Sequence, residues 1–338
     1  MAENITFRTQ LLGGVTEFCQ ETGLKIINNS LHLVELIVLL ARYKEEGVKL
    51  CPKVYLTNDM ATLVAMLPDG EKLTIGTTAP DSDGIKTVLK KCAPLAQDGW
   101  SIYIHDDDTI IEYGLFRGSS NPISVLVDDV LMVDNEDLVV VKAFQIAEEC
   151  VEIKSNTGSH HYIFLNHRKK DSPPPLQYLD DLVHAMSSGV EEKEKESIVS
   201  FLKRLVFDAL RQSHGCIIAV TNMKRTPKFL SEDGVILSIP IDFGKLVKEV
   251  KEDKILPSSL DSKAVLVKGM LNTDGIIIFD NKSRLLGYNC FVKVSKKDEV
   301  IGGARKRAFA TLSSKVGIGL CAVFMQSQDG WSDYKGKE

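Results

Sequence analysis

The sequence predicts a mixed α/β (α+β) protein made of two domains. Short apolar runs of strand length alternate with amphipathic segments of helix length in both halves of the chain. Its 338 residues suit two domains of ordinary size. A proline run, a short apolar helix-like piece at 176–186 and then a charged run occupy residues 171–196 and mark a junction. We therefore expect an N-terminal α/β domain with hairpins over residues 1–170, a linker over 171–196, and a domain over 197–338 with a mixed sheet flanked by helices.

The N-terminal half is predicted to combine helices with hairpins. Residues 1–50 carry an apolar stripe at helical spacing that ends near Gly47. Two apolar runs around the Pro68-Asp69-Gly70 turn predict a hairpin over residues 62–77. The remaining predictions are a helix at 83–96, a second hairpin at 101–116, and strands at 54–57, 124–126, 138–141 and 162–165.

Two polar clusters in this half suggest ligands at first sight. Asp106, Asp107 and Asp108 could be metal ligands, but no EF-hand pattern follows them and a turn is favoured. His160 and His161 are neighbours on a predicted strand edge, so they point to opposite faces and do not suit one metal. A sensing role for these histidines stays open.

The C-terminal half alternates helices and strands. An apolar stripe from Ile198 to Leu210 falls on one helical face. Short apolar runs predict strands, and residues 264–270 fit a helix or a strand equally well. The predicted strands are 216–220, 234–239, 276–279, 285–294 and 320–325, and the predicted helices are 243–250 and 304–315.

The composition indicates a globular cytoplasmic protein. Apolar residues make up 44% of the chain and charged residues 26%, and no apolar run reaches the length of a membrane span. The N-terminus shows no secretory signal. The seven cysteines are scattered and odd in number, which is typical of free thiols in a reducing compartment, and neither Cys nor His shows zinc-ligand spacing.

The charge is unevenly distributed between the halves. Residues 196–338 carry 23 Lys and Arg against 16 Asp and Glu, whereas residues 1–195 carry 18 against 30. The positive excess is too small for long nucleic acid but suits a small, multiply charged anion.

The segment from Asn272 to Ala308 has the composition of a nucleotide site. Asp274 could hold a divalent metal, and Gly275 could let a ligand approach the backbone. Gly302 and Gly303 leave amide groups free at the predicted start of a helix, where an anion is favoured. The following cations Arg305, Lys306 and Arg307 could clamp phosphate oxygens. Taken singly, an Asp-Gly turn and a solvated basic helix face are the simpler explanations.

From about Ile198 to about Gly330, two-fifths of the chain, these residues resemble a diadenylate cyclase domain. That family has an Asp-Gly-Ala motif on one strand and a Gly-Thr-Arg-His-Arg motif at the start of a helix; the corresponding segments here are residues 274–276 and 303–307. The resemblance implies condensation of two ATP into cyclic di-AMP and pyrophosphate with Mg²⁺ or Mn²⁺. It also implies a homo-oligomer with facing sites, regulated by the N-terminal domain.

The resemblance also implies roles for individual residues. Asp274, Arg305 and Arg307 would be catalytic, with Asp274 as the metal ligand. The nucleotide would contact nine further residues: Gly275, Ile276, Phe291, Val292, Gly303, Ala304, Lys306, Ser327 and Gln328.

The sequence departs from the family pattern where the chemistry would occur. Ile276, Ala304 and Lys306 replace alanine, threonine and histidine of the motifs, and Gln326-Ser327-Gln328 lacks the carboxylates that often follow the last strand. An alternative is therefore a module of the same fold that binds a nucleotide signal without turnover. A third hypothesis is a purely structural, partner-binding protein.

Overall fold

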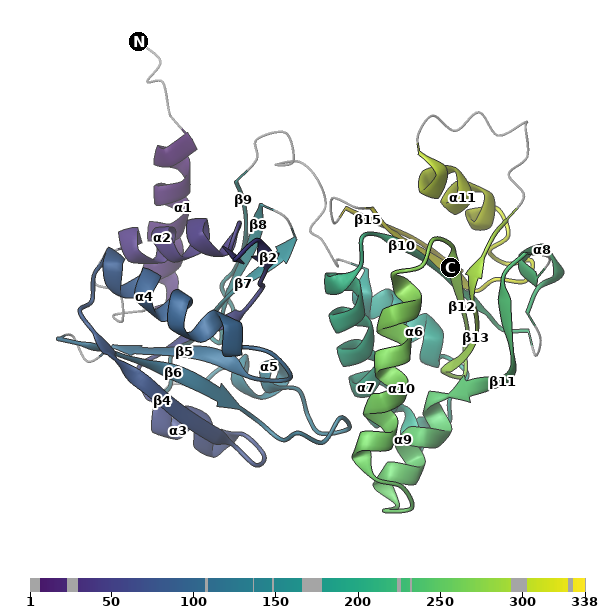
Figure 1. The fold of residues 1–338 in the computed structure, drawn as a ribbon, viewed down its shortest axis with the longest axis horizontal. Helices are drawn as coiled ribbons and strands as arrows, with labels where there is room; N and C mark the ends of the chain where they lie inside the picture. The colour runs from purple at the N-terminus through teal and green to yellow at the C-terminus, as the bar shows by residue number, and fades with distance from the viewer. Residues whose placement is uncertain are drawn as a thin grey trace, which may run out of the picture. The chain divides into compact units, whose positions relative to one another are not determined.

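The computed structural model describes residues 7–22, 30–106, 109–135, 137–147, 149–165, 178–223, 226–231, 233–292, 303–327 and 331–337. Its contacts divide the chain into two compact units. Unit 1 comprises residues 1–120 and 125–171, and unit 2 comprises residues 121–124 and 172–338. Both units are mixed α/β, which confirms the predicted fold class (Figure 1).

Unit 1 is built on a seven-stranded sheet in the order β4-β6-β5-β3-β7-β8-β9. The β3–β5 pair is parallel and the other neighbours are antiparallel. A separate two-stranded ribbon joins β1 (Lys44–Glu45) to β2 (Val48–Lys49). The strands of the large sheet are β3 (Lys53–Thr57), β4 (Glu71–Thr78), β5 (Ser101–Asp106), β6 (Ile111–Arg117), β7 (Val140–Ala147), β8 (Cys150–Ser155) and β9 (His160–Phe164).

Helices cover both faces of this sheet. Phe18, Leu36 and Val88, one from each helix on the first face, are buried against the strands there. Leu63 and Leu131 pack on the opposite face, with Tyr55 and Tyr103. The first-face helices are α1 (Phe7–Thr22), α2 (Ser30–Leu40) and α4 (Ser82–Cys92), with the 3-10 turn η1 (Ala93–Leu95) after α4; the second-face helices are α3 (Met60–Met66) and α5 (Val127–Leu131).

The structure corrects three predictions in unit 1. The predicted hairpin over residues 62–77 is wrong in its first arm, which is the end of helix α3; the Asp59 carboxylate accepts the N–H groups of Ala61 and Thr62 and so begins this helix. Residues 124–126 form no strand but lead into α5. The helical prediction for residues 1–50 fails near its end, where β1 and β2 lie.

Other predictions in unit 1 hold. The hairpin over 101–116 is the antiparallel β5–β6 pair, and the helix over 83–96 is α4 with η1. Strands cover 54–57 and overlap 138–141 and 162–165, while β8 was not predicted. Asp107 and Asp108 lie outside the described residues.

Unit 2 contains a six-stranded sheet in the order β11-β13-β12-β10-β14-β15. The β10–β12 pair is parallel and the other pairs are antiparallel. Five of its strands lie where the sequence predicts apolar runs, and β15 was not predicted. The strands are β10 (Cys216–Thr221), β11 (Val235–Asp242), β12 (Ile276–Asp280), β13 (Arg284–Cys290), β14 (Ala322–Gln326) and β15 (Ser332–Gly336).

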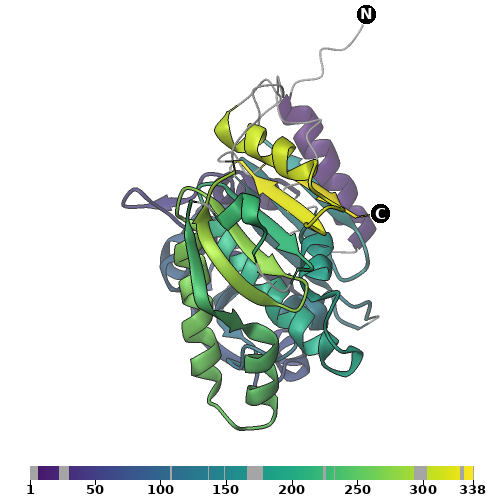
Figure 2. The ribbon, with the colours of Figure 1, turned by 90° about the vertical axis from the view of Figure 1, so that its right-hand side faces the viewer.

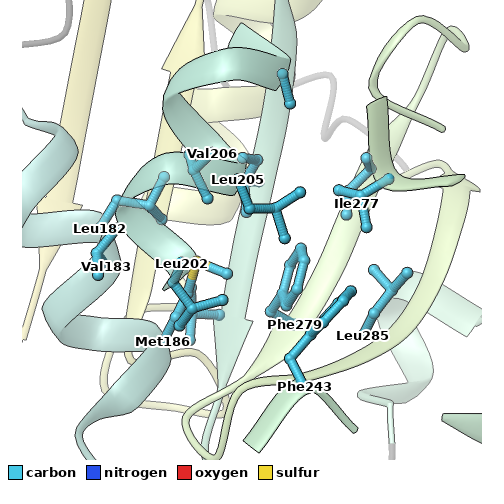
Figure 3. Close-up of a cluster of buried hydrophobic side chains, with 14 of the residues drawn as sticks. Leu182, Val183, Met186, Leu202, Leu205, Val206, Phe243, Ile277, Phe279 and Leu285 are labelled. Carbon is cyan, nitrogen blue, oxygen red and sulfur yellow. The ribbon is translucent and has the colours of Figure 1, made fainter. Parts of the chain in front are cut away.

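Alternation along these strands sends side chains into two separate cores. The larger core lies under α6 (Leu179–Ser187), α7 (Glu192–Gln212), α9 (Phe243–Lys251) and α10 (Pro257–Leu271), and Figure 3 shows Leu202 and Leu205 of α7 facing Phe279 of β12. The smaller core lies under α11 (Ala304–Ser313) and the short α8 (Lys228–Ser231). Figure 2 shows α11 crossing its face of the sheet.

Two details of unit 2 change or complete the sequence prediction. Much of the predicted linker 171–196 is folded: it contains α6 and the start of α7, because Leu182 and Met186 bury their side chains in the larger core. The ambiguous segment 264–270 belongs to α10. Within the described ranges of either unit, no helix is both long and apolar enough to cross a bilayer.

Candidate functional site

The predicted site residues gather at one end of the unit 2 sheet. Here β10 and β12 begin while β13 and β14 end, as the pairings Ile217–Ile276, Ile276–Cys290 and Cys216–Gln326 require. Residues 274–276, 291–292 and 326–327 are therefore close to this sheet end although they are far apart in the sequence.

Helix α11 brings the cations to the same end. Phe309 and Leu312 anchor it on the sheet by packing into the smaller core. Arg305, in its first turn, places Nη2 3.6 Å from Oδ1 of Asp274, and the two side chains are 38% and 95% exposed. The structure thus brings the predicted carboxylate and the predicted cation into contact at the surface.

The positive charge of Arg305 also acts on Cys216, the first residue of β10. Burial raises the pKa of the Cys216 thiol to about 12, and the positive charge of Arg305 opposes that rise. Cys216 is 3% exposed and belongs to the larger core, so it is a packing residue.

Gly275 has a structural explanation that the sequence did not reveal. Its φ is +141°, and a Cβ at this position would lie 2.7 Å from Cα of Asn289. The space predicted for a ligand beside Gly275 is therefore filled by β13. The next residue, Ile276, is 2% exposed in the smaller core, so its side chain is buried and only its backbone remains for a ligand.

The first turn of α11 is open to solvent. Gly303 is the N-cap, no side chain of a described residue caps the helix, and Ala304, Lys306 and Arg307 are exposed. Apart from its chain neighbours and its own helix, no described residue lies within 4 Å of the Cβ position of Gly303. Amide groups and cations at this turn suit an anion such as a phosphate chain.

The other predicted contacts line the ends of β13 and β14. Phe291 is 49% exposed, which is unusual for a large aromatic residue, and Val292 packs partly against the smaller core. Ser327 is half-buried and its N–H donates to the Trp331 carbonyl oxygen at 2.7 Å. Gln328 lies outside the described residues.

Sequence reasoning missed Asp233. The dipeptide Asp233-Gly234 precedes β11 as Asp274-Gly275 precedes β12, and Gly234 has a φ of +139° beside the +141° of Gly275. The carbonyl oxygen of Asp233 accepts the N–H of Phe291 at 3.1 Å. The repeated Asp-Gly followed by apolar residues was the available signal.

A metal at this end would have one protein carboxylate in contact with Arg305. Among the residues that the structure describes, no three His, Cys, Asp or Glu side chains are grouped as metal ligands. Mg²⁺ in nucleotide sites is commonly held by one or two carboxylates together with substrate phosphates. Asp274 therefore fits a metal that arrives with a triphosphate, but not one held by the protein alone.

Unit 1 contains a buried network of charged side chains. Lys142, 7% exposed, lies 3.2 Å from Asp128 and 2.7 Å from Glu152. Tyr55 donates a hydrogen bond to Asp128, and a ring nitrogen of His160 lies 3.0 Å from Glu152. The attraction of these opposite charges offsets part of their desolvation.

The adjacent histidines face opposite sides of the unit 1 sheet, as predicted. His160 is exposed and contacts Glu152 at the rim of the charged network, whereas the ring of His161 makes an edge contact with Phe18 of α1 at 5.4 Å. They therefore do not share a metal.

No protein-family model matches the chain, and no curated protein is significantly similar to it.

Proposed function

We propose that unit 2 binds purine nucleoside triphosphates at the Asp274–Arg305 end of its sheet and joins two of them into a cyclic dinucleotide, with release of pyrophosphate. ATP is the substrate that the resemblance to diadenylate cyclases implies. The observation that carries the proposal is the 3.6 Å approach of Arg305 to Asp274 at the start of α11.

The first turn of α11 suits the phosphate chain. Its free amide groups offer directed donors, and Arg305 and Arg307 carry planar guanidinium groups that pair with phosphate oxygens. Lys306 adds a third charge nearby. These groups would stabilise the negative charge that develops on the departing pyrophosphate.

The carboxylate suits the other reacting group. Asp274 would hold Mg²⁺ or Mn²⁺ together with the phosphates, and such a metal supplies charge neutralisation at the α-phosphate. The 3′-oxygen of one nucleotide would form a bond to the α-phosphorus of the other as the bond to pyrophosphate breaks. Repeating the step closes the ring.

This reaction needs two sites that face each other, so the proposal includes a homo-oligomer. Asp274 is 95% exposed, which leaves it accessible to a nucleotide held by a second copy. Proximity of the two nucleotides would supply much of the rate.

The test is incubation of the full chain with ATP or GTP and Mn²⁺, followed by chromatography. A cyclic dinucleotide is expected from the wild type and from Asp253→Asn, an exposed control far from the site in sequence. Asp274→Asn should abolish the product. If the wild type forms no cyclic dinucleotide from ATP or GTP, with Mg²⁺ or with Mn²⁺, the proposed turnover is wrong.

A second candidate is nucleotide binding without turnover. It is favoured by the contact of the lone carboxylate with Arg305, which reduces the negative charge available to a metal. It predicts calorimetric binding of a triphosphate, weakened by Arg305→Ala, with no product.

We further propose that unit 1 regulates this activity in the cytoplasm. All seven cysteines are free thiols, which suits a reducing compartment.

A further inference from the structure

The end of β13 is held between two Asp-Gly turns. β13 lies between β11 and β12, and the N–H of Phe291 binds the carbonyl oxygen of Asp233 on the β11 side. On the β12 side, Gly275 lies against the backbone of Asn289. Adjacent strands are about 4.8 Å apart, so the two aspartates flank Phe291 about 10 Å from one another.

This arrangement presents Phe291 at the surface. Asn289 has a φ of +51°, and the β12–β13 register shifts between the pairs Ile276–Cys290 and Ile278–Gly287. Such a bulge redirects the strand that follows it. Phe291 is left 49% exposed beside Asp233. Asp233 is exposed, and its carboxylate makes no hydrogen bond or ion pair within the described part of the chain.

We infer that Phe291 and Asp233 form the base subsite of the proposed nucleotide site, and that the Asp233 carboxylate selects guanine over adenine. The inference rests on the proposed function. An exposed aromatic ring stacks on any base, so the ring alone gives no selectivity. The carboxylate is what distinguishes the bases.

The chemistry of the base edges gives the direction of selection. An ionised carboxylate only accepts hydrogen bonds, through two parallel oxygens. The Watson–Crick edge of guanine offers two adjacent donors, N1–H and N2–H, and pairs with both oxygens. Adenine places an acceptor next to its amino group, so one carboxylate oxygen would face a lone pair.

The proposed base subsite lies next to the residues proposed to hold the phosphates. Phe291 follows β13, Asp274 precedes the adjacent β12, and Arg305 lies 3.6 Å beyond Asp274. A nucleotide lying across these strand ends would place its base at Phe291 and its phosphates at the start of α11.

Calorimetry on the full chain tests the inference with GTP, ATP, ITP and inorganic tripolyphosphate. We expect GTP to bind about tenfold or more tightly than ATP, as for a good bidentate base contact. ITP, which lacks the guanine amino group, should fall between them. Asp233→Asn should remove this preference, because an amide offers one donor and one acceptor, the pattern that adenine complements.

The controls separate the base subsite from the phosphate site. Asp253→Asn, which makes the same change at an exposed turn after α9, should keep the GTP preference. Phe291→Leu should weaken the binding of GTP and of ATP by the same factor.

ATP binding as tight as GTP binding, or a preference unchanged in Asp233→Asn, overturns the base assignment and leaves the proposed function standing. Unchanged affinities in Phe291→Leu overturn the placement of the base. Failure of all three nucleotides and of tripolyphosphate to bind overturns the inference together with the proposed function.

Discussion

Gly275→Ala should destabilise unit 2 by about 3 kcal/mol or more. The backbone of Gly275 has a φ of +141°, a region in which a residue with a side chain is strained by about 1–3 kcal/mol. The new Cβ would also lie 2.7 Å from Cα of Asn289 and 2.8 Å from its carbonyl carbon. Those atoms are backbone atoms of β13, which is paired on both sides, so relief requires moving a strand and not a side chain.

Gly269→Ala is the matched control, for which we expect a change in the free energy of unfolding of the opposite sign. Gly269 lies in α10 and is exposed, and outside its own helix no residue that the structure describes lies within 4 Å of its Cβ position. Alanine there should stabilise the helix by about 0.5–1 kcal/mol.

Urea unfolding, followed by tryptophan fluorescence, measures both changes. The chain has two tryptophans, and Trp331 packs against the smaller core of unit 2. A Trp100→Phe background therefore makes the signal specific for this unit. Equal stabilities of Gly275→Ala and the parent protein would refute the argument that β13 requires glycine here.

Three further predictions concern charged groups. Lys142→Met should destabilise unit 1 by about 3 kcal/mol, because it leaves the buried Glu152 without its ammonium partner, whereas Asp128 keeps Lys53 at 3.7 Å. Urea unfolding followed through Trp100 measures this change, and Lys49→Met, at an exposed lysine, should change little. Burial raises the pKa of Glu152, but the hydrogen bond from His160 and the charge of Lys142 outweigh burial and lower the pKa from 4.5 to about 2. The ionised Glu152 should therefore contribute its full stability above about pH 5, and this contribution should be lost as the pH falls toward 2. Glu152→Gln should reduce that pH dependence of the free energy of unfolding. Arg305→Ala should weaken tripolyphosphate binding in calorimetry about tenfold, as expected for a lost charge-assisted hydrogen bond, with Arg305→Lys between; equal affinities would remove Arg305 from the phosphate site.

Local sequence patterns were sufficient for many individual elements. The apolar stripe from Ile198 to Leu210 is buried in α7, as its helical spacing predicts. The runs at 216–220 and 276–279 are buried strands. Each of these patterns repeats along one segment, so it needs no knowledge of the rest of the chain.

One local prediction failed because a single polar residue at the start of a segment decided its secondary structure. Residues 62–67 fit a strand by composition, but the Asp59 carboxylate begins a helix before them. By contrast, the helix-like piece predicted at 176–186 is confirmed by α6, where Leu182 and Met186 pack on the sheet.

The sequence by itself determined the fold class and the types of many elements, and it singled out Asp274 and Arg305 as candidate site residues. Only the tertiary structure decided that these two side chains meet, that Gly275 accommodates Asn289, and that Asp233 lies beside Phe291. The physical reason is strand register: it depends on pairings between residues tens of positions apart, and a one-residue shift would send each side chain to the other face.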